Sequence, residues 1–321
     1  MTDPLLEVRG LAVEFPTPRG IARVLTGVDL DVRRGEVVGL VGESGCGKSV
    51  TALAVLRLLR PPGRIAGGSV RFEGRELTTL SEAEMRRVRG RGIAMIFQAH
   101  RESLNPVLTI GDQLGLLLAR HDALRGRAAR TRARELCAMV ELPDPDRVLR
   151  AYPHELSGGM CQRAMIALAL ACRPALLVAD EATTALDVTV QLQILLLLRR
   201  LREALGLSLL VITHNLGVVA EACQRVAVMY AGEIVETAPA DALFAAARHP
   251  YTRRLLAARP RIGAPPEGEP IPGAVPDPLA RPPGCAFHPR CHRRQPDCAR
   301  NHPELDGDAS GQTVRCFYPE A

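Results

Sequence analysis

A glycine-rich stretch close to the N-terminus has the residue types and the spacing of a phosphate-binding loop. Residues 42–49 are Gly-Glu-Ser-Gly-Cys-Gly-Lys-Ser, which fit the pattern G-x-x-x-x-G-K-[ST] at every fixed position. The glycines let backbone N–H groups close around phosphate oxygens, and a following helix adds the positive end of its dipole. Lys48 would reach the β- and γ-phosphates of a nucleotide, and the Ser49 hydroxyl would bind Mg²⁺. The alternative is a glycine-rich turn that binds nothing.

Polar side chains that suit phosphate hydrolysis follow three apolar runs further along the chain. Asp180 and Glu181 end the run 176–179, where Asp180 would hold Mg²⁺ through water and Glu181 would polarise an attacking water. Gln98 follows the run 93–97 and would reach the same Mg²⁺ and water. His214 follows the run 208–213 as a γ-phosphate contact. Taken singly, the acidic pair also fits a helix cap, and a lone His is more often structural.

A second anion site is predicted at residues 156–163, Leu-Ser-Gly-Gly-Met-Cys-Gln-Arg, where a helix begins. Two phosphate-binding helix starts in one chain make sense if each ATP is held by the P-loop of one subunit and by this segment of a partner. We therefore expect nucleotide contacts from both stretches and from two outlying residues, namely Phe15, Gly42, Glu43, Ser44, Gly45, Cys46, Gly47, Lys48, Ser49, Val50, Ser157, Gly158, Gly159, Gln162 and Asp187. Phe15 would stack on adenine, and a core phenylalanine is the equal alternative.

The pattern of apolar residues predicts the elements that must position these groups. Strands are expected at 5–13, 24–32, 36–41 and 68–72, with a turn or loop at 16–20. Ser81 and Glu84 form a capping box for a short helix. Residues 104–153 look helical, and the basic run 125–134 favours a solvated helix face over nucleic-acid contact. Helices are also expected at 164–171 and at 188–205, where Asp187 caps the helix and Gly206 ends it.

The composition of the chain argues against several classes of protein. The 321 residues suffice for one large domain plus a smaller one, and the net charge of +6 is mild. Aromatic residues make up 3% and Trp is absent, which argues against a stacking platform for single-stranded nucleic acid. We find no signal peptide and no run of 18 apolar residues, so a cytosolic protein that does not itself span a bilayer is expected.

The C-terminal tail differs in character. Prolines crowd residues 260–283, and Cys285, Cys291, Cys298 and Cys316 follow with the spacing C-x5-C-x6-C-x17-C. This is not the paired C-x2-C spacing of a zinc ribbon. Four thiolates still suffice for an iron–sulfur cluster or, with nearby histidines, for zinc, and free thiols or disulfides remain the third reading. A small, proline-rich tail has too little apolar material to fold without a cross-link or a bound metal, and this favours a metal.

The motifs taken together resemble those of ATP-binding cassette ATPases. The P-loop, Gln98, the Leu-Ser-Gly-Gly signature, Asp180-Glu181, Asp187 and His214 occur in the order of that family, over about residues 5 to 237. The resemblance implies an α/β P-loop NTPase fold with a RecA-like core and with antiparallel β and α-helical subdomains. It also implies ATP and Mg²⁺ as ligands, Glu181, His214, Gln98 and Lys48 as catalytic residues, and Ser49, Gln98 and Asp180 around Mg²⁺.

A narrower resemblance is to the ATPase subunits of oligopeptide, dipeptide and nickel importers. It rests on Gly42-Glu43-Ser44, Phe97-Gln98, residues 103–106, residues 187–191 and the tail after His249-Pro250-Tyr251-Thr252. It implies a cassette domain over 1–258, with a helical subdomain at about 100–172, and a small irregular extension over 259–321 whose four cysteines hold a [4Fe–4S] cluster. A soluble cassette ATPase acting on nucleic acid or ribosomes, and a metal-sensing regulator with a residual ATPase, are the alternatives.

The same resemblance implies a set of partners. They are a second cassette, identical or paralogous, two membrane permease subunits and an extracytoplasmic substrate-binding protein, with no nucleic acid. The chain would lie peripherally at the cytoplasmic face of the inner membrane. Three positions depart from the family pattern: Cys161 replaces an Arg in the signature, Ala182 replaces a Pro after Glu181, and Ala99-His100 replaces Asp-Pro. Cys161 is expected to weaken nucleotide affinity or alter the dimer interface.

Overall fold

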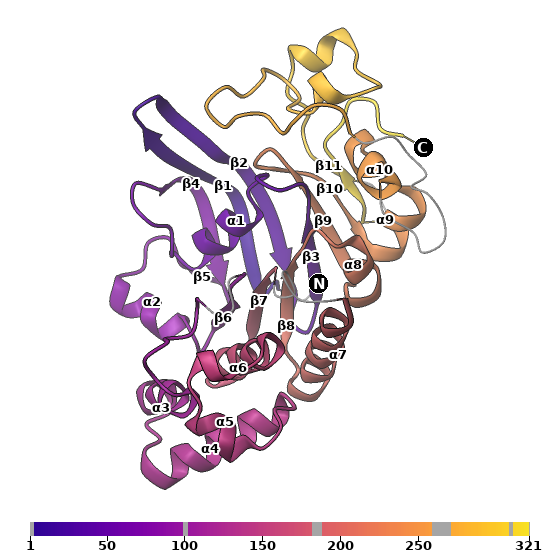
Figure 1. Ribbon diagram of the computed structural model, residues 1–321. Coiled ribbons are helices and arrows are strands. Elements are labelled where there is room, and N and C mark those ends of the chain that lie inside the picture. Colours follow the sequence, from indigo (N-terminus) through magenta and orange to yellow (C-terminus); the bar gives the residue numbers. More distant parts are fainter. Residues whose placement is uncertain (1–2, 99–101, 182–187, 259–270, 308–310, 321) are drawn as a thin grey trace. The chain divides into compact units, whose positions relative to one another are not determined.

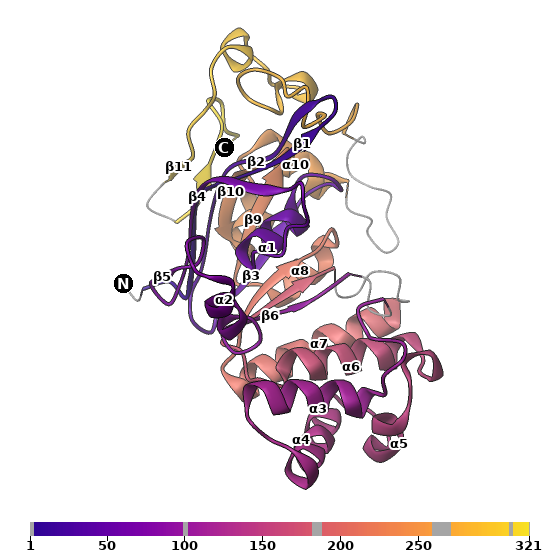
Figure 2. The same ribbon diagram turned by 90° about the vertical axis from the view of Figure 1, so that its left-hand side faces the viewer.

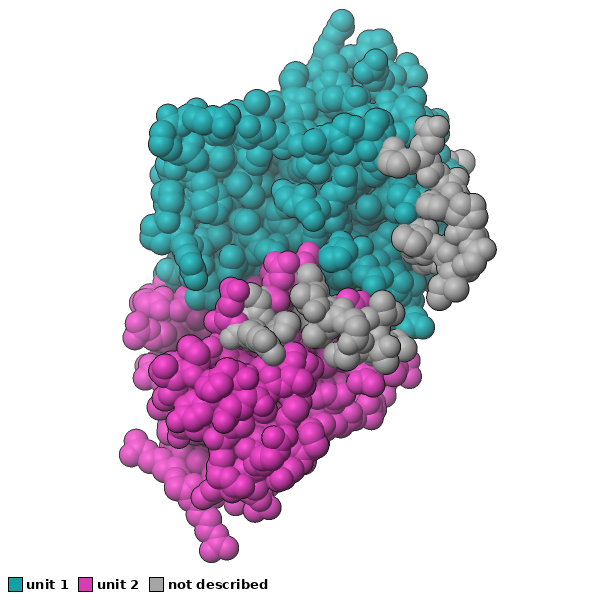
Figure 3. Space-filling view, in the orientation of Figure 1, with its two compact units in different colours: residues 1–79, 211–321 teal, residues 80–210 magenta. Residues whose placement is uncertain are grey.

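A computed structural model of the chain describes residues 3–98, 102–181, 188–258, 271–307 and 311–320. The chain forms two compact units, residues 1–79 with 211–321, and residues 80–210 (Figure 3). The strand β8 (Ser208–Ile212) carries the chain from the second unit back into the first. The boundary predicted at residue 258 falls inside the first unit, so the C-terminal extension shares a unit with the P-loop.

One sheet of the first unit is antiparallel. Its order is β2-β1-β4-β5, formed by β1 (Leu6–Thr17), β2 (Gly20–Val32), β4 (Arg64–Phe72) and β5 (Arg75–Glu76) (Figure 1). The turn or loop predicted at 16–20 is present as a tight hairpin, and it is shorter than predicted because β1 continues to Thr17, which pairs with Gly20 at the start of β2. Pro16 is tolerated there because the pairing of β1 with β4 ends at Glu14, so the missing N–H of Pro16 interrupts no second ladder.

The other strands of the first unit hold the P-loop. Strand β3 (Val37–Val41) is wholly buried and pairs in parallel with β9 (Arg225–Tyr230), and β10 (Glu233–Pro239) pairs antiparallel with β9. The C-terminal extension adds to this sheet, because β12 (Thr313–Val314) pairs with β10 and with β11 (Asp306–Gly307). A mostly irregular tail is therefore fastened to the sheet that carries the P-loop.

Helices complete the first unit. They are α1 (Lys48–Val55), α8 (Leu216–Ala222), α9 (Ala240–Ala246) and α10 (Pro250–Ala257), with the short 3₁₀ helices η2 (His288–Arg290) and η3 (Pro296–Ala299) in the extension. In Figures 1 and 2, α10 lies near the extension.

The second unit is mainly helical, and helices form within residues 104–153, where the sequence predicted them. Strands β6 (Ile93–Ile96) and β7 (Leu176–Asp180) pair in parallel. The predicted capping box of Ser81 and Glu84 is present at α2 (Glu82–Val88). The remaining helices are α3 (Ile110–His121), α4 (Gly126–Met139), α5 (Pro145–Arg150), the 3₁₀ turn η1 (Pro153–Glu155), α6 (Gly158–Leu170) and α7 (Val188–Leu205) (Figure 2). Among the described residues, none of the helices combines the length and the apolar character needed to cross a bilayer.

Candidate nucleotide site

The P-loop connects β3 to α1, and its glycines are required by the backbone. Gly42 has a φ of 154°, and a Cβ there would lie 2.2 Å from the carbonyl oxygen of Met229. Gly47 adopts the left-handed region at φ 111° and caps α1. No side chain fits at Gly42, so the loop can pass close to β9 only with glycine at this position.

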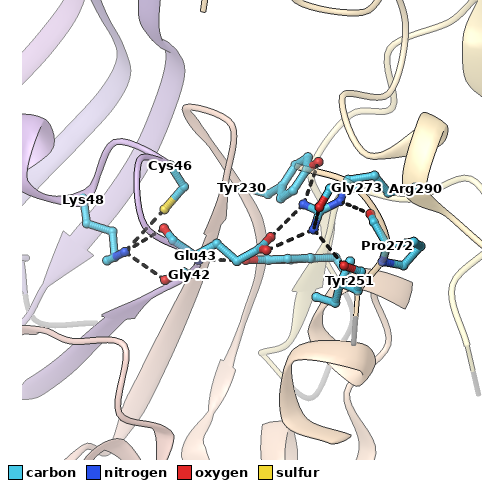
Figure 4. A network of polar contacts seen from close by, with 10 residues as sticks. Gly42, Glu43, Cys46, Lys48, Tyr230, Tyr251, Pro272, Gly273 and Arg290 are labelled. Atoms are coloured by element: carbon cyan, nitrogen blue, oxygen red, sulfur yellow. Dashed lines mark hydrogen bonds and ion pairs between the residues drawn. The ribbon is translucent and has the colours of Figure 1, made fainter. Parts of the chain in front are cut away.

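The ammonium group of Lys48 lies inside this loop (Figure 4). Its Nζ donates to the carbonyl oxygens of Gly42 at 2.8 Å and Glu43 at 2.9 Å, and lies 3.6 Å from the Sγ of Cys46. Lys48 is 5% exposed. Burial raises the pKa of the Cys46 thiol, and the Lys48 charge offsets this only in part. The loop therefore presents a positive charge, with a neutral thiol beside it, where phosphate oxygens are expected.

Two residues far away in sequence hold the P-loop, and no motif assigned either of them a role at the nucleotide site. The Tyr251 hydroxyl accepts a hydrogen bond from the Glu43 N–H at 2.9 Å, across 208 positions. Arg290 forms an ion pair with the Glu43 carboxylate at 2.8 Å, across 247 positions. Such contacts join segments that are far apart in the chain, so no local pattern predicts them. The one hint in the sequence was Glu43, an acidic residue in a loop that binds phosphate.

Two of the predicted catalytic residues meet in the second unit. The Gln98 Nε2 donates to Glu181 Oε2 at 2.6 Å, and Asp180, at the end of β7, is 4% exposed. Glu181 has a φ of 45°, a conformation uncommon for a residue other than glycine and often associated with function. The strand ends thus bring the amide and the carboxylate together, as the positions after 93–97 and 176–179 predicted.

The signature segment begins α6, and Ser157 is its N-cap. The Ser157 Oγ accepts a hydrogen bond from the Met160 N–H at 3.3 Å, with Gly158 and Gly159 in the first turn. Helix α6 therefore starts at Gly158, as the predicted helix N-terminus at Ser157 and the two glycines requires, and it continues through most of the predicted apolar helix 164–171.

Two signature residues lie elsewhere than expected. Gln162 is 0% exposed, so its amide is not on the surface of α6 where a nucleotide held by a partner would lie. Cys161 is also 0% exposed, and its thiol contacts the Pro153 carbonyl oxygen at 3.3 Å. Cys161, which stands in place of a cation, therefore lies in the interior and not on a surface where a second cassette would bind. A small, weakly polar thiol suits such a buried position.

The other predicted residues are distributed as follows. His214 is exposed and follows Thr213, whose N–H donates to the Leu40 carbonyl oxygen at 3.3 Å, so His214 lies beside the strand that leads into the P-loop. Phe15 is half-buried, and its ring lies over Gly63, where a Cβ would be 2.4 Å from the ring. Asp187, Ala182, Ala99 and His100 lie outside the described residues.

The four cysteines of the extension line one cavity, together with His249, His288 and Phe287. All nine cysteines of the chain are in its described part, and none forms a disulfide there. Burial raises the pKa of Cys285 and Cys316 to about 11, with smaller contributions from the neighbouring thiols. Within the described residues, however, no group of three or more His, Cys, Asp or Glu side chains is arranged to hold a metal ion. The four thiols therefore line the same cavity but are not arranged as the ligands of a metal ion.

Comparison with known proteins agrees with this architecture. Residues 25–184 match the ABC transporter family, and residues 235–298 match the family described as oligopeptide/dipeptide transporter, C-terminal region. An ATP-binding cassette solved as a dimer in a post-hydrolysis state with ADP and Pi is 30% identical, with a TM-score of 0.66 over 73% of this chain and 98% of that one. The fold and the P-loop are thus those of an ATP-binding cassette.

Similarity to two curated proteins extends over nearly the whole chain. The oligopeptide transport ATP-binding protein of Bacillus subtilis (strain 168) is 47% identical over 98% of this chain and 97% of its own length. The dipeptide transport ATP-binding protein of Escherichia coli (strain K12) is 46% identical over 98% and 97%. The chain belongs to the ABC transporter ATP-binding proteins.

Proposed function

We propose that this chain is the ATP-hydrolysing subunit of an ABC importer that takes up di- or oligopeptides or a related small solute. The observation that carries the proposal is similarity to peptide transport ATP-binding proteins along almost the entire chain, including the C-terminal region at 235–298. A soluble cassette ATPase acting on ribosomes or nucleic acid would have no reason to share that region.

The proposed reaction is attack of water on the γ-phosphorus of ATP, with cleavage of the bond to the bridging oxygen and departure of ADP. Glu181 would accept a proton from the water, and the hydrogen bond from Gln98 would orient the Glu181 carboxylate. Lys48 and His214 would stabilise the charge on the γ-phosphate. Ser49, Gln98 and Asp180 would hold Mg²⁺, which when bound neutralises charge on the phosphates.

Hydrolysis would require a second cassette, because the signature residues Ser157, Gly158 and Gly159 would complete the site of a partner. The partner would be a paralogue or a second copy. The pair would bind two membrane permease subunits at the cytoplasmic face of the inner membrane, and a substrate-binding protein would deliver the solute from the other side. Closure of the pair on ATP would drive alternating access.

The proposal is tested by deleting the coding sequence in its host and measuring uptake of labelled di- and oligopeptides. We expect uptake to fall, to return with the wild-type chain and to stay low with a Glu181→Gln chain. Unchanged uptake of every peptide tested would overturn the peptide assignment. ATPase activity that rises with RNA or ribosomes and not with the permease subunits would favour the soluble alternative.

We also propose that the extension takes up a [4Fe–4S] cluster through Cys285, Cys291, Cys298 and Cys316. The proposal is supported by four cysteines that form no disulfide and line one cavity, and by a donor set that suits such a cluster. It requires the thiols to move closer together when they bind. Anaerobic purification with iron and zinc analysis tests it. About four iron per chain supports the cluster, whereas one zinc or no metal overturns it.

A further inference from the structure

The P-loop contains an acidic residue, Glu43, at a place that must accommodate a polyphosphate. Its side chain is 28% exposed, and it lies in the same loop as the ammonium group of Lys48. An unpaired carboxylate here would repel the phosphates of ATP across a short, partly buried distance, where electrostatic interactions are strong. Binding of a triphosphate therefore depends on what neutralises Glu43 and on the direction in which its carboxylate points.

Arg290, from η2 of the extension, is the partner of this carboxylate (Figure 4). Its Nη1 lies 2.8 Å from Glu43 Oε2 and its Nη2 lies 3.0 Å from Glu43 Oε1, which is the two-pronged geometry that a guanidinium and a carboxylate prefer. The side chain of Arg290 is only 6% exposed. Burial opposes the charge of Arg290, but its hydrogen bonds and charge interactions with Glu43 and Tyr230 together outweigh burial and raise the pKa of Arg290. The pair is thus a two-pronged ion pair in which the guanidinium is buried and the carboxylate is partly exposed.

The guanidinium is fixed from several sides. Its Nε donates to the Pro272 carbonyl oxygen at 2.7 Å, and Nη1 is 3.3 Å from the Tyr230 hydroxyl. Phe287, three residues before Arg290, is 1% exposed and packs edge-on against Tyr230 and Tyr251. Since the Tyr251 hydroxyl also accepts the Glu43 N–H, both the backbone and the side chain of Glu43 are held from the C-terminal part of the chain.

We propose that Arg290 is a positioning residue for ATP binding, through which the C-terminal extension neutralises Glu43 and turns its carboxylate away from the phosphates. The inference rests on the ATP-binding role proposed above. The extension then sets the affinity of the P-loop for a triphosphate, in addition to capping the edge of the sheet at β10. A chain that lost this contact would keep the P-loop motif and bind ATP more weakly.

The test measures the dissociation constant of ATP by calorimetry on the full chain, in the Arg290→Met and Arg290→Gln variants. Met keeps the length and the apolar packing of the side chain without its charge. We expect the dissociation constant to rise about tenfold, which lies within the range of interaction energies between residues in contact. The difference from wild type should shrink at high salt, because screening weakens the repulsion by Glu43.

The decisive comparison adds Glu43→Gln to either variant. If Arg290 acts by neutralising Glu43, removing the carboxylate restores ATP affinity toward the wild-type value. If the Arg290 variants bind ATP weakly because the extension is less well packed, the Glu43→Gln substitution does not restore affinity. The matched control is Arg315→Gln, because the Arg315 Nε donates to the Ile234 carbonyl oxygen at 3.0 Å and so fastens the extension to β10. Its ATP affinity should stay within about twofold of wild type.

Three results would overturn the inference. They are unchanged affinity in a folded Arg290 variant, no recovery in the double variants, and an equal loss in Arg315→Gln. Thermal unfolding of each chain identifies those that are folded, and the Glu43→Gln/Arg290→Met chain leaves no unpaired buried charge, so at least one informative variant should remain stable. Failure of the wild-type chain to bind ATP would instead contradict the proposed function.

Discussion

At the scale of single residues, the candidate chemistry depends on Glu181. Its carboxylate accepts a hydrogen bond from Gln98 at 2.6 Å, and its backbone is in the left-handed region at φ 45°. This conformation costs on the order of 1 kcal/mol for a residue with a side chain, and it occurs directly after the last residue of β7. A carboxylate on a strained backbone that is oriented by an amide suits a general base.

Replacing Glu181 with Gln should abolish hydrolysis and spare binding. We expect the ATPase rate to fall at least ~100-fold, because general-base catalysis is lost, while the dissociation constant of ATP changes little. Phosphate release and calorimetry on the same preparation measure the two effects. The Glu203→Gln variant, which neutralises an exposed acid on α7, is the control and should hydrolyse ATP normally. Equal rates in the two variants would remove Glu181 from the proposed mechanism.

At the scale of elements, the start of α6 combines a structural cap with a predicted nucleotide contact. The Ser157 Oγ satisfies the Met160 N–H, one of the donors that a helix N-terminus leaves without a partner. The same hydroxyl is predicted to face the ATP held by a partner cassette. Substitutions that keep the cap and change the charge can separate these two roles.

Ser157→Ala should lower the free energy of unfolding by about 1 kcal/mol, whereas Ser157→Asp should preserve it, because Asp caps as well as Ser. Both variants should lose ATPase activity, Asp more strongly, since a carboxylate would repel phosphate. Denaturant unfolding and ATPase assays measure the pair. Thr109→Ala removes the matching cap of α3 and should lower stability by a similar amount without changing activity. An active Ser157→Asp chain would argue against a nucleotide contact at this position.

Helix α4 carries a buried thiol that should make folding sensitive to alkali. Burial raises the pKa of Cys137 to about 11, and the side chain is 0% exposed. The unfolded chain ionises this thiol from about pH 9, while the folded chain keeps it protonated, so stability is lost as the pH rises from 9 toward 11. The loss should be about 1.4 kcal/mol per pH unit.

The measurement compares the pH dependence of unfolding in the wild type and in Cys137→Ala. The variant should be less stable at pH 7 and should show a flatter decline above pH 9, because the ionisable group is gone. Tyrosines and other thiols affect both chains equally, so the difference between the two curves isolates Cys137. Parallel curves would show that this thiol does not resist ionisation in the folded state.

At the scale of the whole chain, the extension is part of the first unit and not an appendage. Its strand β12 pairs with β10, and Phe287 packs against the buried rings of Tyr230 and Tyr251, with ring centroids 5.1 and 5.3 Å apart. These contacts join residues close to the C-terminus to the neighbourhood of the P-loop. Stability of the nucleotide site and integrity of the extension should therefore change together.

Phe287→Ala tests this connection. Removing a buried aromatic ring should lower the free energy of unfolding by ~3–5 kcal/mol through lost burial and a cavity. Phe317→Ala, which truncates a ring of the same extension that is 41% exposed, should change it by less than about 0.5 kcal/mol. Thermal unfolding followed by ATP titration measures both variants. If the two variants were equally stable, the extension would not contribute to the core of the first unit.

Local patterns predicted most of the elements and the site residues that lie on them. The P-loop, the strand ends at Gln98 and Glu181, the capping box at Ser81 and the cap at Ser157 each depend on residues within a few positions of one another, so they can be recognised in the linear chain. The turn predicted at 16–20 is present but shorter than predicted, because pairing with the neighbouring strand β2 continues as far as Thr17 and Gly20 despite the proline at position 16.

The sequence by itself determined the chemistry that this protein can perform, because phosphate binding requires glycines, a lysine and carboxylates at short, fixed spacings. Only the tertiary structure decided what surrounds those groups. In the folded chain Gln162 and Cys161 are buried, four cysteines line one cavity, and Arg290 forms an ion pair with Glu43, which is 247 positions away in the sequence. The physical reason is that burial and long-range ion pairs depend on which surfaces pack together, and packing is a property of the folded chain as a whole.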